Sequence, residues 1–375
     1  MSFYYLLYFP LLLLLFIDND KHSIKEKRNI LIALSFLYSI IGGFGNWDGS
    51  DWSNYKDFFY YCKWSDLRTF VDSSDNYEWG YTLLNVLFKS VFGNFTIFMF
   101  FCTLFYFLTF TNLFIKYAKY PLVIFVLFFF SSLQFCIVRN RIALAILIYA
   151  IPFIFERKLI KFLLITCLAT LIHRSSIIFI LPYLFSYVPV SFITCNAIVI
   201  ASSIAAELFQ KYFFMYGALL GGVYSERIDF YTNTYQSDSV SKSIVSIGLN
   251  VAVVNILLFY DKKINKDNKM SSAIQKHSDE HNILRVLIYT YILTTSLDTV
   301  FMGSFSDFAR LGTMLSSLFF FAWDYVCRSA NLYFYKYRIL YLAIFVFYVV
   351  QKFYHLYIFD VFYSSIYVPY NMCFK

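Results

Sequence analysis

The chain has 375 residues, of which 60% are hydrophobic and only 14% are charged. Ordinary globular chains are about 45–50% apolar and about 25% charged, so this composition excludes a soluble enzyme and a disordered chain. With 12 Gly, 6 Pro and 7 Cys, it also excludes collagen-like repeats and a disulfide scaffold. We therefore predict an integral membrane protein with many spans.

The net charge of +8 favours basic cytoplasmic loops over nucleic-acid binding, because membrane proteins concentrate Lys and Arg on the inner side. The cysteines are scattered without CxxC spacing, so neither a zinc site nor a redox pair is expected. The apolar stretch 3–17 lacks a preceding basic region and a small-residue cleavage site. We expect it to be a retained span rather than a signal peptide.

The expected fold is an all-α, polytopic helical bundle that forms one transmembrane domain over residues 1–375. About 20 apolar residues cross a bilayer as a helix. The apolar runs predict about twelve spans, at 2–17, 28–44, 95–115, 121–138, 142–155, 160–173, 175–187, 192–206, 243–260, 284–301, 309–326 and 339–357.

The basic loop 18–29 is placed inside, which puts the acidic segment 45–78 outside. The short segment 79–92 decides the orientation of everything that follows, and we expect a re-entrant or interfacial helix there that does not cross. More than half of the 31 basic residues then lie in inside loops, with the cytoplasmic loop 261–283 as the clearest anchor. A second large outer loop is expected at 207–242.

Charges outside the cytoplasmic loops are costly in a membrane protein and are usually functional. With this topology they collect on the outer face: Asp48, Asp51, Glu78, Arg139, Arg141, His173, Arg174, Arg227, Asp307 and Arg310. Their convergence predicts an outer, membrane-edge site.

Arg139 and Arg141 stand between long apolar runs and breach the positive-inside rule. A diphosphate on a lipid carrier would compensate them, because Arg offers planar, always-charged donors to phosphate oxygens. An ion pair with a carboxylate on another helix, or snorkelling to head groups, would do so as well. Arg310 begins a late apolar helix, where an anion or the nearby Asp307 is the expected partner.

His173, followed by Arg174, closes an apolar span and is a candidate general base or donor to a leaving phosphate; a purely structural role is the alternative. Asp48 and Asp51 lie among Trp and Tyr, which suits sugar binding, although a solvated acidic loop explains them equally well. D-x-x-D is weak support for a metal. Glu78 precedes a helix, where an acid is ordinary capping.

Six motifs, in order, make the chain resemble the EpsG-like branch of the Wzy polysaccharide polymerases. They are Gly49-Ser50-Asp51-Trp52-Ser53-Asn54-Tyr55, Glu78-Trp79-Gly80-Tyr81, Arg139-Asn140-Arg141-Ile142-Ala143, His173-Arg174-Ser175, Arg310, and Pro369-Tyr370. Asn140 replaces the Gln of the family pattern, and Arg141 and Asp48 are additional charges.

The resemblance implies a metal-independent, GT-C-like glycosyltransferase without a cofactor, in the bacterial cytoplasmic membrane. Its substrates would be undecaprenyl-diphosphate-linked oligosaccharides on the outer leaflet. The growing glycan would move onto a new lipid-linked repeat unit, and undecaprenyl diphosphate would leave. Whether a chain-length regulator or a flippase binds stays open.

In this hypothesis Arg139, Arg141 and Arg310 neutralise the diphosphate, as an oxyanion site would. His173 or an outer acid, Asp51 or Glu78, takes the proton of the acceptor hydroxyl. Loop 207–242, with Arg227, contacts sugar. The alternatives are a polytopic acyltransferase that modifies surface sugars, and a flippase for lipid-linked oligosaccharide.

Overall fold

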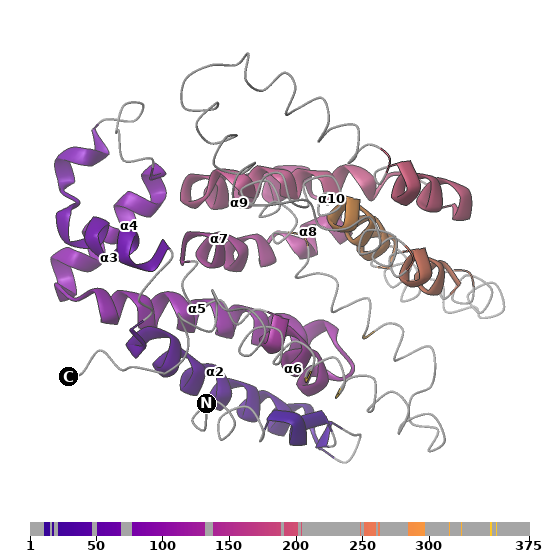
Figure 1. The fold of residues 1–375 in the computed structure, drawn as a ribbon, viewed down its shortest axis with the longest axis horizontal. Coiled ribbons are helices and arrows are strands. Elements are labelled where there is room, and N and C mark those ends of the chain that lie inside the picture. Colours follow the sequence, from indigo (N-terminus) through magenta and orange to yellow (C-terminus); the bar gives the residue numbers. More distant parts are fainter. Residues whose placement is uncertain are drawn as a thin grey trace. The chain divides into compact units, whose positions relative to one another are not determined.

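The computed structural model describes residues 11–15, 17–18, 22–46, 51–68, 77–131, 138–188, 191–201, 251–259 and 284–296 and single positions at 204, 248, 262, 315, 324, 346 and 350. Every regular element within these residues is a helix, which confirms the expected all-α class (Figure 1). The chain divides into two compact units. The first comprises 1–152, 159–177 and 330–375, and the second comprises 153–158 and 178–329.

The first unit contains most of the labelled helices. They are α2 (Ile24–Phe44), α3 (Asp51–Tyr61), the 3-10 helix η1 (Trp64–Leu67), α4 (Trp79–Phe92), α5 (Phe95–Tyr117), α6 (Pro121–Ser131), α7 (Val138–Ile148) and α9 (Leu159–Ile172). Two short elements, α8 (Ile151–Phe155) and η2 (Arg174–Phe179), lie where the chain passes between the units, and α10 (Ile180–Phe185) belongs to the second.

The second unit also holds the helix Phe192–Ala201 and helical residues at 251–259 and 284–296. Asn196 and Asn255 exchange two amide hydrogen bonds of 3.0 and 3.2 Å, and Phe185 stacks on Tyr289. Polar pairs of this kind join apolar helices that have little other directional contact.

Among the described residues, α5 alone is long and apolar enough to cross a membrane by length and composition. It matches the predicted span 95–115, and Asn94 caps its start by accepting hydrogen bonds from the backbone of Thr96 and Ile97. Shorter apolar helices cover Leu159–Ile172, Arg174–Phe185 and Phe192–Ala201. The predicted spans 309–326 and 339–357 lie outside the described residues, apart from single positions.

The prediction of one continuous helix over 142–155 is wrong. Helix α7 ends at Ile148 and α8 begins at Ile151, with a turn over Tyr149 and Ala150 between them. Pro152 accounts for the break, because proline has no backbone N–H to donate to the carbonyl of Ile148, four residues earlier, and its ring clashes with that carbonyl. Helix α2, by contrast, begins four residues before the predicted span 28–44, where Ser23 and Glu26 form a capping box.

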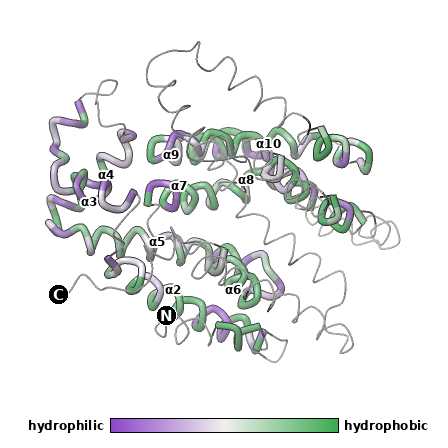
Figure 2. The backbone as a smooth tube through the Cα atoms, viewed as in Figure 1, coloured by the Kyte–Doolittle hydropathy of each residue, from purple (hydrophilic) through white to green (hydrophobic). Residues whose placement is uncertain are grey.

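Aromatic rings fill the space between α2, α5 and α6. Tyr38 lies 4.0 Å from Phe129, and Phe110 lies 4.0 Å from Phe128, measured between ring centroids. Figure 2 shows α6 as hydrophobic along its length, whereas α3 and the start of α7 are hydrophilic. The high aromatic content of the sequence thus supplies the core of the first unit, since rings in these offset and tilted arrangements attract beyond their buried area.

Helices α2 and α5 pack antiparallel. Ser35 and Thr111 share a hydrogen bond of 2.9 Å, and Gly43 faces Phe100 so closely that a Cβ there would lie 2.5 Å from the Phe100 Cα. The end of α2 therefore lies beside the start of α5. Helices α3 and α4, which come between α2 and α5 in the sequence, lie at this end of the pair, at the left of Figure 1.

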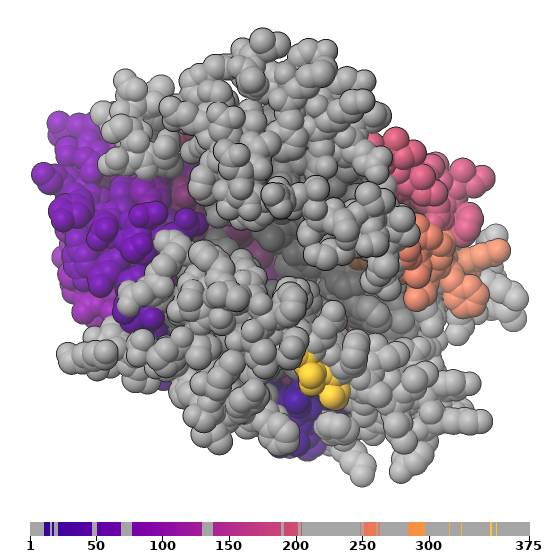
Figure 3. Space-filling model, in the orientation of Figure 1, coloured from indigo at the N-terminus to yellow at the C-terminus, as the bar shows by residue number. Residues whose placement is uncertain are grey.

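The basic start of α2 therefore lies at the same end of this helix pair as Lys116 and Lys119. At the other end, α3 and α4 form a continuous surface, seen in violet in Figure 3. Lys89 of α4 links α4 to the C-terminal end of α3 by donating hydrogen bonds to the carbonyl oxygens of Tyr60 and Cys62 at 2.5 and 2.9 Å.

A buried ion pair connects the start of α2 with the start of α6. Asp18 and Lys27 lie 2.7 Å apart with side chains 0% and 6% exposed, and Asp18 also accepts hydrogen bonds from the backbone N–H groups of Leu122 and Val123. Asp18 thus caps α6 from more than one hundred residues away, and Pro121, which has no N–H to satisfy, starts that helix.

We expect Asp18→Asn to lower the free energy of unfolding by about 3–5 kcal/mol, because it strands Lys27 as a buried, unpaired charge. The double variant Asp18→Asn/Lys27→Met should lose much less, since it removes both charges. Thermal unfolding in a mild detergent measures both. Lys25→Met, at an exposed position of α2, is the control and should behave as wild type. A double variant as unstable as the single one would contradict this account.

Candidate functional site

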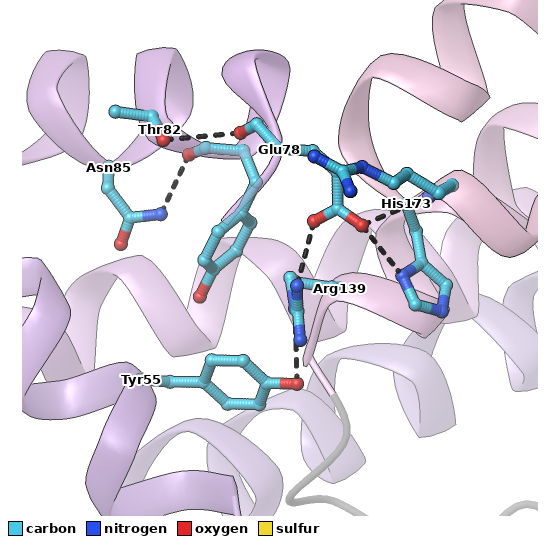
Figure 4. Close-up of polar contacts among 8 residues, drawn as sticks. Tyr55, Glu78, Thr82, Asn85, Arg139 and His173 are labelled. Atoms are coloured by element: carbon cyan, nitrogen blue, oxygen red, sulfur yellow. Dashed lines mark hydrogen bonds and ion pairs between the residues drawn. The ribbon is translucent and has the colours of Figure 1, made fainter. Parts of the chain in front are cut away.

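Three helix ends of the first unit meet at one carboxylate. Glu78 stands at the start of α4, Arg139 in the first turn of α7 and His173 directly after α9. Arg139 Nη1 donates to Glu78 Oε2 at 2.8 Å, and His173 Nδ1 lies 3.3 Å from Glu78 Oε1 (Figure 4). The backbone N–H of Arg174 donates to the same Oε1 at 3.0 Å. The three side chains, which we call the Glu78 cluster, are 7%, 19% and 15% exposed in this order.

The interpretation of Glu78 as an ordinary helix cap needs correction. Glu78 does occupy the N-cap position of α4, but its side chain makes no capping hydrogen bond. The carboxylate turns toward α7 and α9 instead, where the guanidinium of Arg139 is a charge-assisted partner and the imidazole of His173 and the backbone N–H of Arg174 complete its contacts.

Gly80 lets α4 come this close. A Cβ at Gly80 would lie 2.8 Å from the carbonyl oxygen of Leu171 and 3.1 Å from Ile172 Cδ1, in the last turn of α9. The Glu-x-Gly motif and the His173 motif are therefore two sides of one helix contact. The glycine removes the side chain that would hold Glu78 away from His173.

Two tyrosines hold Arg139 from the other side. Its guanidinium lies 5.5 Å from the ring of Tyr55 and 4.7 Å from that of Tyr77, and its Nε donates to the Tyr55 hydroxyl at 3.4 Å. Figure 4 shows Tyr55 beneath Arg139 and Glu78 above it. Neither tyrosine was predicted as a site residue. Tyr55 closes the early Gly-x-Asp-x-x-x-Tyr motif, which was the available signal, whereas Tyr77 had none beyond its neighbour Glu78.

Glu78 is ionised over the whole physiological range. Burial alone would raise its pKa, but the hydrogen bond from His173, the charge of Arg139 and the backbone N–H of Arg174 outweigh burial and lower the pKa to about 2. An ionised carboxylate only accepts hydrogen bonds, so the proton in the contact with His173 is assigned to Nδ1. When His173 is neutral, Nε2 therefore carries the lone pair and is the ring nitrogen that can accept a proton.

Because the pKa of Glu78 falls from its ordinary 4.5 to about 2 on folding, ionised Glu78 stabilises the folded state fully above about pH 4.5. This stabilisation, of the order of 3 kcal/mol, is lost as the pH falls through about 2. We expect the gap in unfolding free energy between wild type and Glu78→Gln to shrink across this window, measured by denaturant titration in a non-ionic detergent. A gap of constant size from pH 6 to pH 2 would contradict the prediction.

Three other predicted site residues are also described by the structure. Arg141 is buried on α7, with its guanidinium 5.1 Å from the ring of Tyr106. Side chains two residues apart on a helix do not share a face, which explains why Arg139 and Arg141 diverge. Asp51 is the first residue of α3, one turn before Tyr55. Arg174 is exposed and contributes its backbone N–H.

The remaining predicted positions lie outside the described residues. These are Asp48, Arg227, Asp307, Arg310, the Pro369-Tyr370 motif, the outer loop 207–242 and, apart from position 262, the cytoplasmic loop 261–283. In the part of the chain that is described, no group of three or more His, Cys, Asp or Glu residues could hold a metal ion. The Glu78 cluster is instead a carboxylate held by one guanidinium, one imidazole and one backbone N–H, an arrangement that suits proton transfer at that imidazole beside a fixed positive charge.

The described part of the chain is thus helical, with one helix long and apolar enough to cross a membrane and with a buried charge cluster where three helix ends of the first unit meet. The chain belongs to the EpsG family, whose model matches residues 27–372. Membership confirms the resemblance seen in the sequence and places the chain among membrane proteins of polysaccharide biosynthesis, in a family associated with glycosyltransferase or polymerase activity. No curated protein and no solved structure matches the chain.

Proposed function

We propose that this protein polymerises undecaprenyl-diphosphate-linked oligosaccharide repeat units into surface polysaccharide. It acts as a GT-C-like glycosyltransferase at the outer face of the bacterial cytoplasmic membrane and needs no metal or cofactor. The observation that carries the proposal is the Glu78 cluster, in which one carboxylate holds an arginine and a histidine delivered by two other helices.

The bond changes follow from these groups. A hydroxyl oxygen on the non-reducing end of the new lipid-linked unit attacks the anomeric carbon of the growing glycan. The bond from that carbon to the phosphate oxygen breaks, and undecaprenyl diphosphate leaves with the electron pair. The hydroxyl proton passes to His173 Nε2, since Nδ1 is held by Glu78.

Glu78 is not the base in this proposal. A carboxylate with a pKa of about 2 is a weak proton acceptor, and its two oxygens already accept from Arg139, His173 and the backbone of Arg174. Its part is to orient His173 and to hold Arg139 in place. Arg139 balances the charge that develops on the departing diphosphate, together with Arg310; Arg141, which turns toward Tyr106 instead, is given no contact with the phosphate. Asp48, Asp51 and Arg227 are assigned to sugar binding.

Polymerisation in vitro tests the proposal. Purified protein in a bilayer is given a defined undecaprenyl-diphosphate-linked repeat unit and a chelator, and the products are separated by size. A ladder of lengthening glycans with release of undecaprenyl diphosphate is expected. Acyl transfer to the sugar without chain growth would favour an acyltransferase, and movement of the intact lipid-linked unit across the bilayer without new bonds would favour a flippase.

A further inference from the structure

Helix α9 carries an exposed apolar stripe that ends at the Glu78 cluster. Ile160, Leu164, Leu168 and Leu171 are 75%, 66%, 53% and 37% exposed, and they recur at intervals of three and four residues, so they share one face of the helix. The opposite face, with Phe162, Thr166, Ala169 and Ile172, is buried. In Figure 2 the helix is hydrophobic along most of its length.

A cation stands at the head of this stripe. Arg174 follows Leu171 by three residues, is exposed, and begins η2. Its backbone N–H is fixed on Glu78 Oε1 at 3.0 Å, so its position relative to His173 is set by the same carboxylate that holds Arg139. One helix face thus presents about 16 Å of apolar surface, roughly half the hydrocarbon thickness of a bilayer, with a guanidinium at its end.

We infer that this face, which we call the α9 rail, binds the carrier lipid: the polyprenyl chain lies along Leu164, Leu168 and Leu171, and the diphosphate meets Arg174. The inference rests on the proposed function and names the surface where its lipid substrate binds. Charge complementarity argues for this occupant, because a long hydrocarbon with an anionic head matches an apolar stripe that is followed by the exposed Arg174, whose backbone N–H is held by the Glu78 cluster.

The two parts of the rail contribute differently. A polyprenyl chain is already dissolved in lipid, so contact with leucines gives it little driving force. The leucines guide the chain, and the head group supplies the selectivity over ordinary phospholipids. Neutralising Arg174 should therefore weaken binding of the diphosphate lipid without affecting the corresponding polyprenol, whereas a bulky side chain on the rail should hinder both.

Photo-crosslinking of the full chain in nanodiscs tests the inference. The probe is an undecaprenyl diphosphate with a diazirine in its chain, and crosslinked peptides are mapped by mass spectrometry. We expect crosslinks within residues 160–171 that unlabelled undecaprenyl diphosphate displaces and that the same concentration of phosphatidylglycerol leaves in place. Arg174→Gln should weaken this displacement about tenfold or more, and Arg174→Lys less, because Lys keeps the charge without the planar fork.

Leu168→Trp should reduce the crosslinks at least severalfold, whereas Leu37→Trp, at an exposed apolar position of α2, should leave them unchanged. Equal displacement by phosphatidylglycerol would overturn the inference, because the rail would then face bulk lipid. Displaceable crosslinks mapped elsewhere, with polymerisation intact, would overturn the rail and leave the proposed function standing. Absence of both displaceable crosslinks and polymerisation would remove the proposed function and the rail with it.

Discussion

Glu78→Gln is expected to lower glycan polymerisation by the purified protein at least 100-fold, although the substitution changes a single oxygen to an amide. Gln has one acceptor oxygen and two N–H donors, so it cannot accept from both Arg139 and His173 without turning a donor toward one of them. Arg139 loses its buried counter-charge, and His173 loses the group that holds its proton on Nδ1. Either loss misplaces a group on which stabilisation of the transition state depends. Each 1.36 kcal/mol of transition-state stabilisation that is lost lowers the rate tenfold.

A Glu78→Gln protein that unfolds more easily would also polymerise less glycan. A second variant therefore separates lost stability from lost catalysis. Breaking a buried ion pair costs about 3–5 kcal/mol, and removing both charges costs less. Glu78→Gln/Arg139→Gln should therefore unfold at a higher temperature than Glu78→Gln while remaining inactive. Glu156→Gln, which breaks the half-exposed pair with Lys158, is the matched control and should keep wild-type activity. Wild-type glycan lengths from a stable Glu78→Gln protein would refute the role given to this carboxylate.

The helices that the sequence predicted well are those whose limits have local causes. Helix α5 begins at the predicted residue because Asn94 caps it and Gly93, with a φ of +61°, turns the chain directly before it. The end of α4 is set by the same glycine. The break within 142–155 also has a local cause, Pro152, and could have been predicted from the sequence.

The partners of Glu78 could not be predicted from the sequence. Arg139 and His173 are 61 and 95 residues away, and a single sequence holds no signal for contacts at that separation. Local rules therefore favoured capping, which any acid before a helix satisfies. The different directions of the Arg139 and Arg141 side chains, by contrast, could have been predicted from the sequence, since residues two apart on a helix do not share a face.

Three of the six motifs now have a common physical reason. Glu78 with Gly80, Arg139 and His173 are far apart in the chain, but each stands at the end of a helix, and α4, α7 and α9 bring those ends together. A helix end is where backbone groups remain available, as the N–H of Arg174 demonstrates by donating to Glu78. Charged side chains placed there reach a shared site without interrupting the apolar faces that pack the helices.

Gly80→Ala is expected to reduce polymerisation tenfold or more and to lower the melting temperature of the protein. Alanine is the better helix former by about 0.5–1 kcal/mol, so local propensity predicts stabilisation. The contact with α9 predicts the opposite, because the new Cβ would lie 2.8 Å from the Leu171 carbonyl oxygen, which is backbone and cannot rotate away. Overpacking of this kind typically costs about 1–3 kcal/mol and exceeds the gain in propensity. The α4 helix must shift, and the contact between Glu78 and His173, already 3.3 Å long, is the first to open.

Two further variants locate the cause of this loss. Gly248→Ala, where a Cβ meets nothing within 4 Å, should leave activity unchanged and gives the effect of the Gly-to-Ala change alone. Trimming the second neighbour, in Gly80→Ala/Ile172→Val, should not restore activity, because the closer obstacle is the Leu171 backbone. If Ile172→Val fully restored polymerisation, the steric conflict with Gly80→Ala would come from the movable Ile172 side chain and not from the backbone. Retained activity in Gly80→Ala itself would mean that the Glu78 cluster tolerates displacement of α4, and the requirement for a close helix contact would then fall.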